Sequence, residues 1–275
     1  MFKGFYSAAS GMLTGQRRAE MLTNNLANAN TPGFKADQAS TRAFPEMLLS
    51  RINTPTTAKR NGGLPTVNQI GTLNTGVYIQ DVTPNFNQGD LTKTELTTDI
   101  ALNNITMPLS NNGMQGNVFF TVQSQSGGTQ YTRNGNFTMD GAGYLTTGTG
   151  QLVLDTNGQP IQLFNDDFIV TEDGFIQQNG QNVARLGIAY AENPNSLSKT
   201  ANGLYEANEG ALPSAYNNNQ VQFTTKQGYI ERSNVDATDT MTNLLTAYRT
   251  FEANQKVLQA YDRSMDKAVN EIGKV

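Results

Sequence analysis

The chain has 275 residues, of which 37% are hydrophobic and 15% charged, and its net charge of −4 argues against a nucleic-acid partner, which would be bound through Lys and Arg. It has neither Cys nor His, which removes disulfides, thiolate chemistry, the usual general base and the commonest transition-metal ligand. No stretch approaches the ~20 apolar residues of a membrane helix, so we expect no membrane insertion. Because Cys and His are absent, we also expect no metal, no cofactor and no catalytic activity.

The first 35 residues carry the pattern of an amphipathic helix. Apolar or small residues recur at spacings of three and four, which places them on one helix face. These residues are Phe5, Ala8, Met12, Gly15, Ala19, Leu22 and Leu26. Pro32 and Gly33 then stop the helix, because Pro cannot continue the hydrogen-bond ladder.

Residues 36–95 are mixed in character and predict a linker or extended region. Within it, residues 44–51 are compatible with a short helix, and residues 53–63 resemble a flexible loop.

Residues 96–234 predict an antiparallel β domain. Asn-Gly pairs at 134–135, 157–158 and 179–180 favour tight hairpin turns, because both residue types tolerate positive φ. Short β-type runs lie between such turns, at 118–122, 130–132, 136–139, 151–154, 160–164, 167–171 and 183–190. The acidic pairs Asp166-Asp167 and Glu172-Asp173 lack the alternating spacing of a calcium loop, so turn chemistry explains them better.

The last segment, residues 235–275, repeats the helical pattern. Asp236 and Asp239 stand where an N-cap and its third-position partner would lie. The predicted seam consists of Met241, Leu244, Tyr248, Phe251, Leu258, Met265, Val269 and Ile272, interrupted by Gln255 and Asp262.

The predicted layout is therefore helix, β region, helix. A lone helix with an apolar stripe in water is marginally stable, so each stripe needs a partner. We expect an α+β fold in which residues 1–35 and 235–275 form one discontinuous helical domain. The stripes can cover each other within the chain, as an intramolecular coiled coil, or pack against neighbouring molecules. The expected interface core is Phe5, Met12, Leu22, Leu26, Met241, Leu244, Tyr248, Phe251, Leu258 and Met265.

Both ends resemble the flagellar basal-body rod and hook protein family. At the N-terminus the resemblance is carried by Ser7–Met12 and, almost letter for letter, by residues 24–35. At the C-terminus it is carried by residues 233–236, 241–245 and 247–258. Residues 131–137 are similar to a hairpin of the family's β domain.

The resemblance implies a structural subunit of the rod, with length and linker residues most similar to the distal rod protein or a close paralogue. Such subunits self-assemble through terminal helices into a hollow axial structure. The implied partners are copies of the chain, other rod and hook proteins, and the flagellar export apparatus. The implied location is the basal body outside the cytoplasm, reached by type III export without a cleaved signal peptide.

Two other functional classes remain open on the sequence. One is an accessory, cap or regulatory protein of the hook–basal body that uses the same helices for a transient complex. The other is a carboxylate-based glycosidase, although no Asp/Glu pair stands in a recognisable catalytic context.

Overall fold

The computed structural model describes residues 3–52, 67–110, 113–124, 127–200, 203–208 and 210–272. The chain forms two compact units, each assembled from segments distant in sequence. Unit 1 consists of Met1–Asn24, Gln38–Val82 and Thr238–Val275, and unit 2 of Asn25–Asp37 and Thr83–Ala237. The predicted α+β fold, with paired terminal helices and antiparallel β structure between them, is confirmed.

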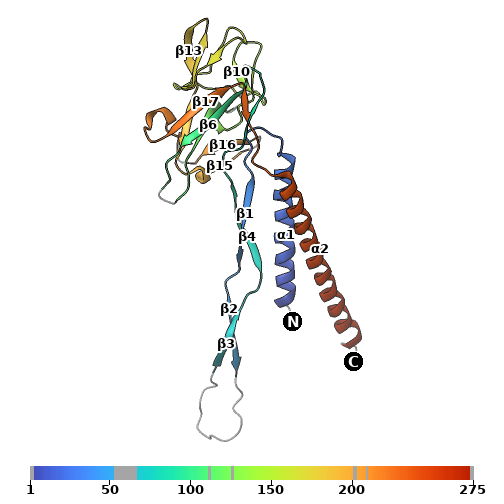
Figure 1. Ribbon diagram of the computed structural model, residues 1–275. Coiled ribbons are helices and arrows are strands. Elements are labelled where there is room, and N and C mark those ends of the chain that lie inside the picture. The colour runs from blue at the N-terminus through green and yellow to red at the C-terminus, as the bar shows by residue number, and fades with distance from the viewer. Residues whose placement is uncertain are drawn as a thin grey trace. The chain divides into compact units, whose positions relative to one another are not determined.

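Unit 1 combines two helices with a two-stranded β ribbon (Figure 1). Helix α1 spans Lys3–Ala27 and helix α2 spans Ala237–Lys267, followed by a π-helical turn, η4 (Ala268–Ile272). The ribbon is built from β1 (Asp37–Ala43), β2 (Met47–Ile52), β3 (Val67–Leu73) and β4 (Val77–Pro84). β1 pairs with β4, and β2 pairs antiparallel with β3.

The ribbon corrects the expectation for residues 44–51. The short helix predicted there is wrong, because Met47–Ile52 is strand β2. Its partner strand β3 supplies the hydrogen bonds that a helix would have made internally, and a local reading of the sequence does not include that partner. The loop expected at residues 53–63 lies outside the described residues.

The helix ends follow from capping and turn chemistry. α2 begins at Ala237, which leaves Asp236 at the N-cap position, and Asp239 lies in the first turn, where the helix dipole favours an acidic residue. α1 ends at Ala27, before the predicted stop at Pro32. The intervening residues form turns closed by bonds from Asn28 N–H to the Asn25 carbonyl and from Thr31 N–H to the Asn28 carbonyl.

Unit 2 holds a five-stranded sheet in the order β14-β7-β8-β16-β15 and a three-stranded sheet in the order β11-β12-β13. The remaining strands form the pairs β9–β10, β6–β17 and β5–β18. The strand bounds are β5 Leu91–Lys93, β6 Ile100–Thr106, β7 Asn117–Gln123, β8 Thr129–Thr132, β9 Phe137–Met139, β10 Leu145–Thr147, β11 Ile169–Val170, β12 Phe175–Gln178, β13 Gln181–Arg185, β14 Ile188–Ala191, β15 Leu197–Lys199, β16 Leu204–Ala207, β17 Gln222–Gln227 and β18 Tyr229–Glu231. Unit 2 also contains the 3₁₀ turns η1 (Pro194–Ser196) and η3 (Ala215–Asn217).

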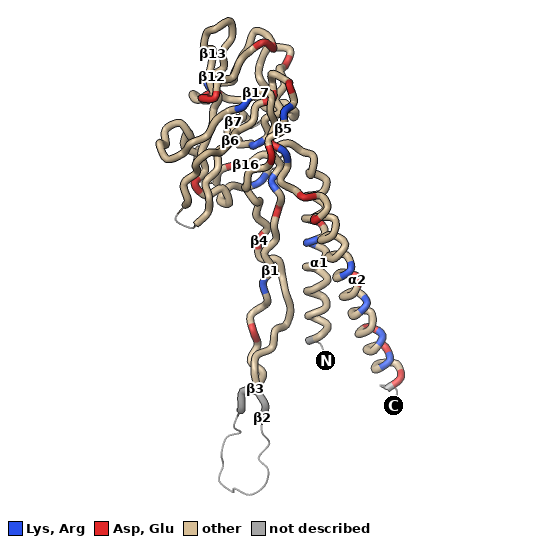
Figure 2. Tube along the Cα trace, in the orientation of Figure 1, with Lys and Arg blue, Asp and Glu red and all other residues tan. Residues whose placement is uncertain are grey.

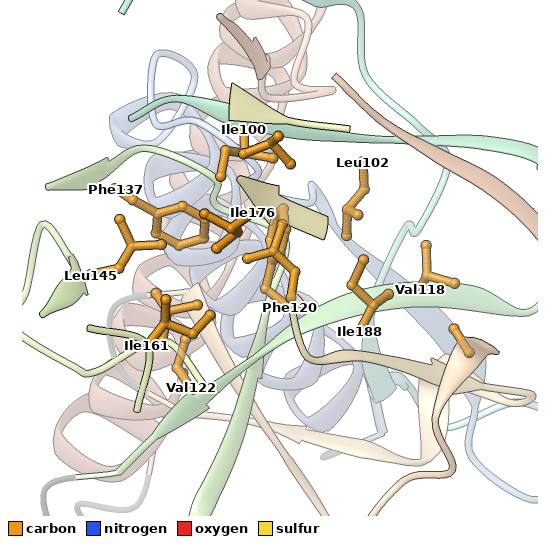
Figure 3. Packing of buried hydrophobic residues seen from close by; sticks show 14 of the residues in the cluster. Ile100, Leu102, Val118, Phe120, Val122, Phe137, Leu145, Ile161, Ile176 and Ile188 are labelled. Carbon is orange, nitrogen blue, oxygen red and sulfur yellow. The ribbon is translucent and has the colours of Figure 1, made fainter. Parts of the chain in front are cut away.

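Strand β7 separates two apolar clusters because alternate residues of a strand face opposite sides. Val118, Phe120 and Val122 face the larger cluster, where Phe120 meets Phe137 edge to face with ring centroids 5.0 Å apart (Figure 3). Phe119 faces the smaller cluster, where it packs on Phe86 and Tyr205. Burial on both faces explains why Val118, Phe119 and Phe120 are consecutive apolar residues and do not alternate with polar ones.

Of two Asn-Gly pairs predicted to form hairpin turns, one does and one does not. Asn179-Gly180 joins β12 to β13, and its φ angles of 53° and 76° suit a hairpin turn with two left-handed residues. Asn134-Gly135 does not close a hairpin, because β8 and β9 on either side of it pair with other strands. Gly135 instead lies so close to the Ile100 carbonyl that a Cβ would overlap it. The runs at 151–154 and 160–164 form isolated bridges and no continuous strand.

Replacing Phe120 with Ala should lower the free energy of unfolding of unit 2 by about 3–5 kcal/mol, because a fully buried ring is lost and a cavity is left. Phe164→Ala is the matched control, since that ring is 91% exposed and its loss should change stability by less than about 0.5 kcal/mol. Denaturant unfolding followed by circular dichroism measures both, and equal effects of the two substitutions would contradict the placement of the core.

Candidate assembly interface

The two helices of unit 1 pack along a seam that alternates spacings of four and three on α2. Thr240, Leu244 and Ala247 are the buried residues of that helix. Further along, the least exposed positions continue the same alternation. They are Phe251, Asn254, Leu258, Tyr261 and Met265. This is the heptad spacing of a coiled coil, so α2 presents one continuous face.

The facing side of α1 is lined by small residues. A Cβ on Gly11 would lie 2.8 Å from the Asn254 amide nitrogen, and one on Gly15 would lie 3.4 Å from the backbone nitrogen of Phe251. A Cβ on Gly4 would overlap the Tyr261 hydroxyl. Residues later in α1 therefore contact residues earlier in α2, so the two helices run antiparallel. The glycines allow the close approach because α2 side chains fill the space that a Cβ would occupy.

A second face of α1 holds the β ribbon through hydroxyl groups. Ser7 Oγ donates to the Thr75 carbonyl at 3.1 Å, and Thr14 Oγ1 donates to the Val77 carbonyl at 3.0 Å. Between them, Ser10 Oγ accepts from Val77 N–H at 3.3 Å. These helix positions are three and four residues apart and therefore lie on one side of the helix. The ribbon is held by hydrogen bonds from hydroxyl groups of α1, while the seam to α2 is a close contact of α1 glycines with α2 side chains.

The sequence-predicted interface residues are distributed over several environments. Leu22 and Leu244 are buried, and Phe5, Met12, Leu26, Phe251, Leu258 and Met265 are half-buried. Met241 and Tyr248 remain 48% and 49% exposed within the chain. Their role as interface core therefore stays a prediction about contacts with other molecules.

Half of the observed α2 seam differs by one residue from the predicted one. Thr240, Ala247, Asn254 and Tyr261 occupy it in place of Met241, Tyr248, Gln255 and Asp262. Hydrophobicity alone favoured the larger residues at 241 and 248. Ala247 and Asn254 lie in the seam instead, because the glycines of α1 that face them leave room for close contact.

Both helices keep apolar side chains that neither the seam nor the ribbon covers. On α2 these are Met241, Leu245 and Tyr248, at spacings of four and three, and on α1 they are Tyr6 and Leu13, seven residues apart. We call these two sets the exposed strips. Tyr248 and Phe251 also line a shallow groove with Gln16, Ala19, Glu20 and Thr23 of α1.

Unit 2 contains a buried ion cluster that sequence reasoning did not identify. Lys35 Nζ donates to Glu231 Oε1 at 2.6 Å, and Arg133 Nε donates to Glu231 Oε2 at 2.8 Å. All three side chains are at most 1% exposed. Lys35 and Arg133 both lie within the motifs that carry the family resemblance. A charged residue inside each of these motifs was therefore the only sequence signal that could have pointed to the buried cluster. Glu231 lies 196 residues from Lys35, and no local pattern marks it.

Electrostatics within this cluster are unbalanced, since two cations share one anion. Burial, together with the nearby Arg133, lowers the pKa of Lys35 to about 8, although Glu231 opposes the change. Burial alone would raise the pKa of Glu231, but the nearby Arg133 and Lys35 hold it below the usual value of 4.5. Glu231 therefore stays ionised at neutral pH.

Gly15→Leu should weaken the helix pair by about 1–3 kcal/mol, because the new side chain would have to enter space held by Phe251. The loss is expected although Leu favours a helix over Gly by roughly 0.8 kcal/mol. Amide hydrogen exchange of residues 244–258 measures the effect. Arg17→Leu, at an exposed position on the same helix, is the control. Equal protection in the two variants would show that the seam does not pass over Gly15.

The stability of unit 2 should rise as the pH increases from about 8, with Lys35 as the cause. The pKa of Lys35 is about 10.5 in the unfolded chain and about 8 in the folded one. Between these two pH values the unfolded state binds more protons than the folded state, so stability rises with pH. The gain is at most about 3 kcal/mol, since one pKa unit corresponds to about 1.4 kcal/mol. Denaturant unfolding at several pH values tests this.

Lys35→Met is the control for that titration and should remove the rise. The window should end near pH 10, because burial raises the pKa of Tyr205 and so reverses the slope above that pH. A rise of the same size in Lys35→Met would assign it to other groups.

No helix in the described part of the chain is both long and apolar enough to span a bilayer. Among the described residues there is also no group of three or more Asp and Glu placed to hold a metal ion.

Three family models match the chain. The flagella basal body rod protein model matches residues 5–35, the flagellar hook protein FlgE/F/G D1 domain matches residues 113–204, and the flagellar basal body rod FlgEFG protein C-terminal model matches residues 226–271. The first and last matches cover the two helices, and the middle match covers most of the five-stranded sheet.

Relatives of full length agree with these models. The flagellar hook-basal body complex protein FlhO of Bacillus subtilis is 47% identical over 277 residues, covering 100% of both chains. The flagellar basal-body rod protein FlgG of the same organism is 30% identical, covering 98% of this chain and 99% of the relative. FlgF of Caulobacter vibrioides is 30% identical and covers 100% of both. The resemblance seen in the terminal motifs is thus confirmed along the whole length, and the chain belongs to the flagellar basal-body rod and hook protein family, as a structural protein and not an enzyme.

Proposed function

We propose that the chain is a subunit of the flagellar distal rod and polymerises through its terminal helices into a hollow axial structure. The observation that carries this proposal is the pair of exposed strips on α1 and α2. Each helix already uses one face for the other helix and still has apolar side chains in water. A contact with a further molecule would bury them.

The charge distribution on α1 supports burial in an assembly. Residues 4–16 of this helix contain no charged side chain (Figure 2). Lys3 precedes this stretch, and Arg17 and Arg18 follow it. Removing a charge from water without a partner is costly, so an uncharged helix surface can be enclosed by neighbours at a small desolvation cost. Three polar side chains of this stretch, Ser7, Ser10 and Thr14, already bond the ribbon.

An open assembly follows if the exposed strip of one copy meets a different surface on the next. Such head-to-tail contacts produce a helical filament when the rotation between successive copies does not close a ring. The partners in this proposal are copies of the chain, other rod and hook proteins, and the flagellar export apparatus. The location is the basal body outside the cytoplasm, reached without cleavage of a signal peptide.

A second candidate is an accessory component of the hook–basal body, such as a cap or regulatory binding protein. The observation that favours it is the 47% identity to a protein named for the hook-basal body complex, against 30% to a rod protein of the same organism. Quantifying a tagged chain in purified basal bodies separates the two candidates. Stable presence in many copies supports a rod subunit, whereas absence or a few copies supports the accessory role.

Leu245→Asp and Tyr248→Asp should abolish incorporation into the rod and leave the chain folded. Both side chains are exposed in the single chain, so the charge costs little there, whereas in an assembled interface it would be buried without a partner. Motility and basal-body composition measure incorporation, and circular dichroism of the purified variants measures folding.

Thr246→Asp is the matched control, because it introduces the same charge at an exposed position between the two test sites, on another face of α2. Leu258→Asp should also block incorporation, but it faces the helix seam and would disturb the α1–α2 pair as well. Full motility with Leu245→Asp and Tyr248→Asp would refute the proposed interface.

A further inference from the structure

Glu231 connects four segments of unit 2 that are distant in sequence. Its carboxylate accepts from Lys35 Nζ, from Gly89 N–H at 2.9 Å and from Arg133 Nε. Its backbone carbonyl accepts from Gly33 N–H at 2.8 Å. A single residue near the C-terminal helix thus bonds the turn after α1, the stretch before β5 and the end of β8.

The two cations around Glu231 are anchored unequally. Arg133 has three further acceptors, which are the Val118 carbonyl at 2.8 Å, Asn104 Oδ1 at 3.1 Å and the Leu102 carbonyl at 3.3 Å. Lys35 has one further acceptor among the described residues, the Asn87 carbonyl at 2.7 Å. If the Glu231 charge is removed, Arg133 remains well bonded inside the β structure. Lys35 is then the cation that leaves.

The segment around Lys35 depends on the C-terminal side at further points. Ala36 N–H donates to Asn234 Oδ1 at 2.7 Å, in addition to the Gly33 bond to Glu231. Asn25 and Asp37 exchange two bonds, Asn25 Nδ2 to the Asp37 carbonyl at 2.8 Å and Asp37 N–H to Asn25 Oδ1 at 2.9 Å. These two bonds join the end of α1 to the same segment, so residues 25–37 behave as one docked piece.

Other contacts of this piece reach the β structure without the C-terminal side. Lys199 Nζ lies 2.8 Å from both Asp37 carboxylate oxygens and 4.4 Å from the centre of the Phe34 ring. The Lys199–Asp37 pair is partly exposed to solvent, so it contributes less than the buried cluster. Phe34 is buried and adds an apolar contact.

We propose that Glu231 makes the docking of residues 25–37 conditional on the C-terminal segment 231–234. Without that segment, docking would leave two buried cations with no anion, together with unpaired N–H groups at Gly33 and Ala36. Because the ribosome makes residues 25–37 long before residue 231, this piece stays undocked until the chain is nearly complete. The coupling acts as a check that both ends are present before the end of α1 is fixed.

Glu231→Gln tests this coupling in the full-length chain, because it removes the charge and keeps the shape. Hydrogen exchange at neutral pH should show the amides of residues 33–37 losing at least about a hundredfold in protection, the scale expected when one partner of a buried pair is removed. The amides of β7 should keep theirs. Glu95→Gln is the matched control, since Glu95 pairs with Lys93 at the surface and both side chains are largely exposed.

Adding Lys35→Met to Glu231→Gln covers the case in which the single variant does not fold. The double variant has no Lys35 cation left to expel, and Arg133 keeps its other acceptors, so residues 33–37 should regain much of their protection. Unchanged protection of these residues in Glu231→Gln would overturn the proposal. So would a loss shared equally by β7 in Glu231→Gln, or no recovery of residues 33–37 in the double variant. The measurement needs no assembly, so its failure is distinguishable from failure of the rod function.

Discussion

Two buried cations sharing one carboxylate set the constraint on which unit 2 is organised. Lys35, Arg133 and Glu231 come from three separate parts of the chain and lie out of contact with water. A buried ion cluster is a weak source of stability, because desolvation offsets most of the attraction. Its effect is specificity, since an arrangement lacking one member leaves a buried charge unpaired. The cluster therefore selects the arrangement in which all three segments are present.

Unit 1 follows a different physical rule. Its helices approach closely because Gly4, Gly11 and Gly15 leave room for Tyr261, Asn254 and Phe251. The α1 glycines contribute little apolar area, so the hydrophobic gain of the seam comes from α2 side chains such as Leu244 and Phe251. Leu245 and Tyr248 lie outside the seam. A helix pair with this distribution gains stability when further molecules cover its outer side.

The sequence predicts the elements that repeat and does not predict the contacts that depend on a distant partner. Periodicity identified both helices, and turn chemistry identified the turn at Asn179-Gly180, although the strand before it, β12, was not among the predicted runs. The α2 seam was misplaced by one residue at alternate positions, because small residues on α1 admit Ala247 and Asn254. Asn134-Gly135 was misread since its role is a close approach to Ile100. Glu231 could not be found, because its partners lie 98 and 196 residues away.

The two rules together separate folding from assembly in this chain. Unit 2 has its own apolar core around Phe120 and Phe119, each fully buried, so its stability does not depend on what covers the helices. Unit 1 packs Phe251 and Tyr261 against glycines of α1 and keeps apolar side chains such as Leu245 in water. In the proposed assembly, substitutions on the exposed strips would act on association, whereas substitutions in the β core would act on folding. The proposed interface would then be separate from the surfaces that keep unit 2 folded.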